Sequence, residues 1–95
     1  MIDHLVFLAV REDASPEDVE DLISSIRGLK NTVPGVVDLT VGENFSERSG
    51  GHTHGLFVRF ESVEDLQEYL KHQDHLAVAA KLDRLTDRLV VDYEF

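Results

Sequence analysis

The sequence contains no cysteine and no tryptophan, and its nine basic residues are outnumbered by nineteen acidic ones. Without cysteine there is no disulfide framework and no thiolate chemistry. The formal net charge of -10 would repel nucleic-acid phosphates and anionic membrane surfaces, so we expect neither as a partner. The longest apolar run, Leu5 to Val10, is far too short to cross a bilayer, and the first residues lack the features of a secretory signal. We therefore expect a cytoplasmic protein.

The length of 95 residues predicts one domain, residues 1–95, with a single core. Ile2 to Val10 is apolar at both odd and even positions, which is typical of a strand covered on both faces. Ser15-Pro16-Glu17-Asp18 reads as an N-cap, a first-turn proline and a capping-box acid, so a helix is predicted over Pro16 to Lys30.

The rest of the chain continues the alternation of strands and helices. Ser62 is predicted to cap the second helix, and the segment after it either continues that helix beyond a bend or forms a third one. The predicted ranges are a strand over 36–42, a polar loop over 44–51, a strand over 54–61, a helix from 63, a helical segment over 74–85 and a strand over 89–95. The order β-α-β-β-α-(α)-β predicts an α+β, ferredoxin-like sandwich.

In this topology the helices cover one face of a four-stranded antiparallel sheet and leave the other face open. The open face is predicted to be largely apolar, because the first and third strands are hydrophobic on both sides. An apolar patch of that size usually marks an interface. We therefore expect a homodimer joined through the sheet faces.

Histidine is the conspicuous candidate for chemistry, because its ring can donate, accept or take up a proton near neutrality. Two histidines lie in Gly51-His52-Thr53-His54-Gly55, and two more lie one helical turn apart at His72 and His75. Either pair could hold a transition metal, but no cysteine ligand or H-E-x-x-H motif accompanies them. We expect no metal and no cofactor.

Other familiar motifs are absent or weak. The serines lack the G-x-S-x-G context of a hydrolase nucleophile, and Gly50-Gly51 lacks the remaining residues of a phosphate-binding loop. The backbone carbonyls around Lys30, Val33 and Val36 could bind a hard cation such as magnesium in a structural role.

Several short motifs, in order and covering nearly the whole chain, resemble the stress-responsive α/β-barrel family, also called the Dabb or dimeric α/β-barrel family. The motifs are His4-Leu5-Val6-Phe7-Leu8, Val33-Pro34-Gly35-Val36, Val41-Gly42-Glu43-Asn44-Phe45-Ser46, Thr53-His54-Gly55-Leu56, Phe60-Glu61-Ser62-Val63-Glu64-Asp65-Leu66 and His72-Gln73-Asp74-His75. The resemblance implies a homodimer in which two sheets form a β-barrel, with a small pocket between sheet and helices in each subunit.

The resemblance also implies site residues. A plant polyketide cyclase of this family uses a tyrosine and histidines in the pocket, without a cofactor; the tyrosine falls on Tyr69 and a catalytic histidine on His75. Further pocket histidines fall on His4, His54 and His72. The family usually has proline after the first histidine of H-x-x-H, where this chain has Gln73, so the bend that orients His75 is expected to differ.

Residue chemistry gives Tyr69 and His75 complementary roles, with the imidazole removing an acidic proton and the phenol donating to an enolate oxygen. His54 is predicted to approach His75, at the end of the sheet where the second helix finishes. His4 is predicted at the opposite end, in a structural role. Phe57 and Leu66 are expected beside Tyr69.

Three functions follow from these observations. The first is a stress-associated Dabb homodimer with a small apolar pocket for a small hydrophobic ligand and no assigned reaction. The second is a cofactor-free acid-base cyclase or isomerase acting on a polyketide-like carbonyl substrate through Tyr69 and His75. The third, which rests on analogy of fold alone, is a heme-free monooxygenase.

Overall fold

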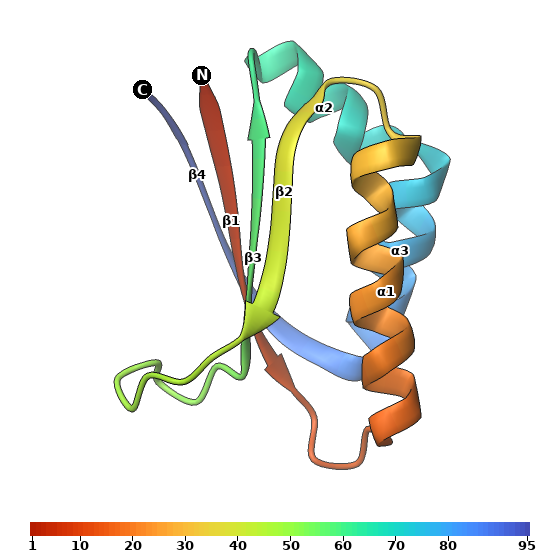
Figure 1. Cartoon of the computed structure of the whole chain (residues 1–95), viewed down its shortest axis with the longest axis vertical. Helices are drawn as coiled ribbons and strands as arrows, with labels where there is room; N and C mark the ends of the chain where they lie inside the picture. Colours follow the sequence, from red (N-terminus) through yellow and green to blue (C-terminus); the bar gives the residue numbers. More distant parts are fainter.

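A computed structural model describes the whole chain, residues 1–95, as one antiparallel sheet with helices on one face (Figure 1). The strand order is β2-β3-β1-β4. The strands are β1 (Ile2–Val10), β2 (Val36–Glu43), β3 (His54–Phe60) and β4 (Thr86–Glu94), and the helices are α1 (Pro16–Thr32), α2 (Val63–Lys71) and α3 (Gln73–Leu85). The predicted ferredoxin-like α+β fold is confirmed.

The helices begin where the sequence predicts. The side chains of Ser15 and Ser62 accept hydrogen bonds from the backbone N–H groups of Asp18 and Asp65, which caps α1 and α2. The helices pack their apolar faces onto the sheet and enclose one cluster of sixteen buried residues, with Leu8, Leu22, Ile26, Val58 and Phe60 fully buried. None of the three helices is long and apolar enough to cross a membrane.

The structure selects one of two alternatives that the sequence left open, and it moves one predicted boundary. Residues 73–85 form a separate helix, because His72 has extended backbone angles and interrupts α2. The last strand begins at Thr86 rather than Leu89: Thr86, Asp87 and Arg88 pair with the end of β1 although they lack the apolar character of a typical strand. Pairing with β1 therefore extends the strand over these three residues, although their own strand propensity is low.

The face of the sheet away from the helices is open and apolar. It includes Phe7 of β1 and the alternate residues of β4, Leu89, Val91 and Tyr93, which are 38 to 53% exposed. The β2–β3 loop, residues 44–53, projects on this side of the sheet (Figure 1). Gly50 and Gly51 have positive φ angles that allow its tight turn.

Candidate acid-base site

A cavity of about 170 Å³ lies between the sheet and the helices α2 and α3. Its apolar wall comes from both layers, and five polar side chains face it. The lining residues are His4, Val6, Leu56, Tyr69, Leu70, His75, Ala79, Leu82, Arg88, Val90 and Asp92. Two of the residues predicted as catalytic, Tyr69 and His75, therefore border the same space.

Tyr69, in the last turn of α2, is 1% exposed and packs its ring against Phe60, with centroids 5.0 Å apart. Its hydroxyl makes no hydrogen bond to another residue, yet no buried polar side-chain atom is both sealed from solvent and unpaired. The hydroxyl thus faces the cavity with its hydrogen-bonding capacity unused. Burial raises the pKa of the Tyr69 phenol, so the group stays protonated and acts as a donor.

His75, in the first turn of α3, lies beside Tyr69, with the two ring centroids 4.5 Å apart. Its Nδ1 donates to the Leu70 carbonyl oxygen at 3.2 Å, and since a carbonyl only accepts, Nε2 carries the free lone pair of the neutral ring. Burial lowers the pKa of His75 below its ordinary value, and the nearby charges of His4 and Arg88 act in the same direction. A neutral imidazole beside a protonated phenol is the arrangement required of a base and a hydrogen-bond donor.

His4 also borders the cavity, which corrects the prediction that it lies at the far end of the sheet. Its ring is 4% exposed, its centroid lies 6.0 Å from that of Tyr69, and its Nδ1 donates to the carboxylate of Asp92. Asp92 is its neighbour on β4. The carboxylate fixes the orientation of the imidazole next to Tyr69.

The prediction that His54 approaches His75 is wrong. α2 has nine residues and is about 13 Å long, whereas β3 has seven residues and spans about 20 Å. The helix therefore ends before it reaches the start of β3, and Tyr69 in its last turn lies beside His4. His54 lies at that other end, near Arg27 of α1, and its Nδ1 bonds the Thr53 hydroxyl.

The other residues predicted to bind a ligand, Phe57, Leu66 and His72, do not line the cavity of Tyr69 and His75. Phe57 points to the open face, where the guanidinium of Arg59 lies 5.1 Å from its ring centroid, because it alternates with the cavity-facing Leu56 and Val58 along β3. Leu66 is a buried core residue and does not line the cavity. His72 borders a different depression beside Pro34 and Gly35.

His72 instead forms the bend that positions His75. Its Nδ1 accepts a hydrogen bond of 3.1 Å from the backbone N–H of Asp74, so its side chain caps α3. The cap replaces the helix-breaking effect of the proline expected at position 73, and α3 then begins at Gln73, two residues before His75.

Replacing His72 by alanine is expected to lower the free energy of unfolding by about 1 kcal/mol, because the Asp74 N–H loses its acceptor. Asparagine is a good N-cap residue, so His72→Asn is expected to retain most of that stability. Urea denaturation of the three proteins measures both effects. Equal stability of the alanine variant and the parent would show that the cap contributes nothing.

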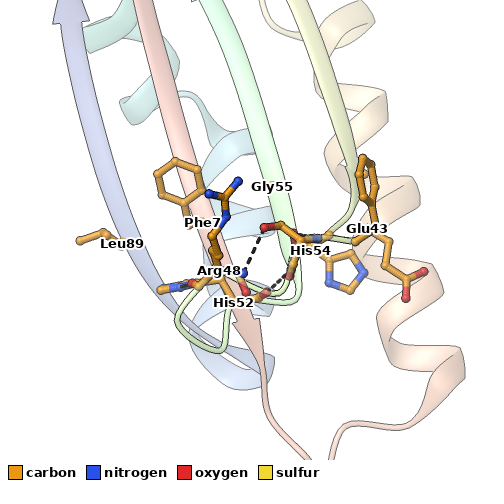
Figure 2. A pocket seen from close by; sticks show the side chains of 12 residues that line it. Phe7, Glu43, Arg48, His52, His54, Gly55 and Leu89 are labelled. Atoms are coloured by element: carbon orange, nitrogen blue, oxygen red, sulfur yellow. Dashed lines mark hydrogen bonds between the residues drawn. The ribbon is translucent and has the colours of Figure 1, made fainter.

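A larger cavity, about 600 Å³, lies on the open sheet face beneath the β2–β3 loop. Figure 2 shows Phe7 on the sheet and Arg48 and His52 on the loop facing this space. Of the histidines that line it, His52 bonds the Ser49 carbonyl through Nδ1, and His54 bonds the hydroxyl of its neighbour Thr53 through Nδ1. This cavity forms part of the face expected to meet a second subunit.

Arg88 and Asp92 are lining residues that the sequence did not suggest. They flank Val90 on the helix-facing side of β4, opposite the apolar row of Leu89, Val91 and Tyr93. The sequence hides this arrangement, because Leu89, Val90 and Val91 form an unbroken apolar run and Arg88 precedes the strand predicted over 89–95. The structure contains no cluster of three or more histidine, cysteine, aspartate or glutamate side chains suited to hold a metal ion.

Comparison with known proteins identifies the family of the chain. The family model of the Stress Responsive A/B Barrel Domain (Dabb) matches residues 2–95, and the chain belongs to this family. It is 26% identical to olivetolic acid cyclase of Cannabis sativa over 97% of this chain and 94% of the cyclase. It is 30% identical to the stress-response A/B barrel domain-containing protein HS1 of Arabidopsis thaliana, over 98% of this chain and 88% of HS1.

Solved structures show the same architecture. A crystal structure of an Arabidopsis thaliana protein, 28% identical, superposes with a TM-score of 0.90 over 100% of this chain and 95% of its own. A Bacteroides fragilis protein of 24% identity and TM-score 0.83, matched over 99% of this chain and 95% of its own, is described as dimeric, ferredoxin-like and of unknown function. Because relatives include a named cyclase and proteins named only for stress response, family membership defines the fold and leaves the activity undetermined.

Proposed function

We propose that the protein is a cytoplasmic homodimer whose cavity binds a small, largely apolar carbonyl compound and transfers a proton next to the carbonyl group without a cofactor. The observation that carries the proposal is the Tyr69 hydroxyl, which is unpaired, faces the cavity and lies beside the His75 imidazole. A buried donor without a partner is costly in a core, but it is useful where a ligand supplies the acceptor.

The chemistry follows from the two groups. Nε2 of His75 takes the proton from the carbon next to the carbonyl, and the C–H electron pair moves to form an enolate. The Tyr69 hydroxyl donates a hydrogen bond to the enolate oxygen as its charge develops. The imidazolium then returns the proton to carbon, or the enolate carbon attacks a second carbonyl of the same molecule and closes a ring, and the imidazolium protonates the alkoxide that forms. Ring closure is supported by the similarity of the chain to a protein named olivetolic acid cyclase.

The size of the cavity limits the ligand. A cavity of about 150 Å³ accommodates benzene, and the volume here is about 170 Å³. The cavity therefore suits a body of one six-membered ring. Among the lining residues, Val90 is 46% exposed, so the ligand is expected to enter along β4.

The homodimer is proposed to form through the open sheet face. Phe7, Leu89, Val91 and Tyr93 share this face and are exposed in the single subunit. Burying them removes apolar surface from water, and solved neighbours described as dimeric support the assembly. The cavity lies on the opposite side of the sheet, between the sheet and the helices α2 and α3.

Exchange of the α hydrogens of cyclohexanone for deuterium tests the proposal. We expect the protein to accelerate the exchange in D2O, followed by proton NMR, with a rate that falls as pH drops through the pKa of His75. Since burial lowers that pKa from 6.5, the neutral form of the ring predominates at pH 6.5 and above, and the rate is expected to fall at lower pH.

The buffer without protein gives the background rate. A protein-dependent rate that keeps rising in proportion to hydroxide above pH 7 would contradict an imidazole base, and exchange at the background rate would contradict the proposed activity altogether.

A further inference from the structure

Arg88 is the only arginine or lysine that lines the cavity of Tyr69 and His75. It lies on the edge strand β4, opposite Leu8 of β1, on the side of the sheet that faces the helices. Its side chain is 29% exposed, and its charge acts on His75. A permanent cation thus borders a cavity whose other walls are mostly apolar.

Arg88 and Asp92, the oppositely charged residues of the lining, lie far from each other. Arg88 and Asp92 are four residues apart on one strand, which places their backbones about 13 Å from each other with Val90 between them. Asp92 is engaged by His4. A negative group on a ligand at the Arg88 end is therefore remote from the carboxylate of Asp92.

The guanidinium also has unused donors. Only Nη1 donates within the protein, to Asp83 at 2.7 Å, whereas arginine offers five N–H donors in a planar fork. The Asp83 side chain is 70% exposed, and such surface ion pairs are weak. A ligand carboxylate can share Arg88 with Asp83 or replace it.

We propose that Arg88 is a specificity residue that binds a carboxylate, so that the preferred ligand is a small enolisable ketone bearing a carboxylate on an otherwise apolar body. The inference rests on the proposed function and names its substrate class. The net charge of -10 disfavours anions over the surface as a whole, so a preference for an anionic ligand requires a local cation such as Arg88.

Two probes of the same shape isolate the charge. They are 3-oxocyclohexane-1-carboxylate and its neutral amide, 3-oxocyclohexane-1-carboxamide; cyclohexanone is the probe without a side group. Binding is measured by calorimetry and α-hydrogen exchange by NMR, at pH 8 and about 0.1 M salt, where His75 is neutral and long-range charge effects are screened.

We expect the parent protein to bind the carboxylate about 10- to 100-fold more tightly than the amide, as hydrogen bonds to charged groups allow. Arg88→Leu is expected to abolish this preference, so that the carboxylate and the amide bind with the same affinity. Arg88→Lys keeps the charge and is expected to retain part of the preference, and Asp83→Asn frees the guanidinium and is expected to retain or increase it.

Equal binding of the two probes by the parent, or a preference that survives in Arg88→Leu, would overturn the inference and show that Arg88 only covers Leu8 and pairs with Asp83. Cyclohexanone exchange then still supports the proposed function. Conversely, a carboxylate preference that depends on Arg88, without exchange of any probe, would support the anion site and contradict the proton-transfer function.

Discussion

Replacing His75 by asparagine is expected to slow the protein-dependent exchange of cyclohexanone by about 10²- to 10⁴-fold, the usual contribution of a general base. Asparagine can still donate to the Leu70 carbonyl that His75 contacts at 3.2 Å, but it has no basic nitrogen. The fold is expected to persist, because His75 is only half-buried. The measurement is kcat/KM for exchange, with the melting temperature recorded for each variant.

Two further variants are compared with His75→Asn: one removes the proposed donor, and the other is a matched control outside the cavity. Tyr69→Phe removes the donor to the enolate and is expected to cost about 10²- to 10³-fold in rate, without loss of stability, because the hydroxyl has no partner in the protein. His52→Asn is the matched control: Nδ1 of His52 also bonds a backbone carbonyl, that of Ser49 at 2.7 Å, but the residue lies outside the cavity. A parent-like rate for His75→Asn, or an equal loss in His52→Asn, would contradict the assignment of the base.

Introducing glutamate at Val91 is expected to convert the homodimer into single subunits. Val91 pairs with Leu5 on the open face and is 42% exposed in the subunit. In the proposed dimer the new carboxylate would be buried without a partner, which costs several kcal/mol. That cost raises the dissociation constant by at least about 100-fold. Sedimentation velocity over a range of concentrations measures the change.

The control for Val91→Glu is Leu76→Glu. Leu76 is 54% exposed but lies on α3, away from the open face, so its replacement is expected to leave the dimer intact. Because the cavity lies on the helix side of the sheet, opposite the open face, the Val91→Glu subunit is expected to keep its exchange activity. A dimer that survives Val91→Glu, or a parent protein that sediments as a single subunit, would contradict assembly through the sheets.

The element order could be predicted from the sequence because local signals agree with the fold. Ser15 and Ser62 mark the helix starts, and both cap as expected. The fold could be predicted because these local signals and the packing of the whole domain favour the same structure.

The arrangement of the site was harder to predict because it depends on relative lengths. A short α2 and a bend at His72 place Tyr69 beside His4 instead of His54. No local pattern encodes how far a nine-residue helix reaches along a sheet. Asp92 and Arg88 were missed for a related reason: their role depends on pairing with β1, at the opposite end of the chain.

A crystal structure of the protein with bound cyclohexanone tests the acid-base site most directly. We expect the ring between β4 and the helices α2 and α3, with its oxygen within hydrogen-bonding distance of Tyr69 Oη and an α carbon facing Nε2 of His75. A ligand bound only beneath the β2–β3 loop, beside Phe7 and His52, would contradict the assignment of the site to Tyr69 and His75.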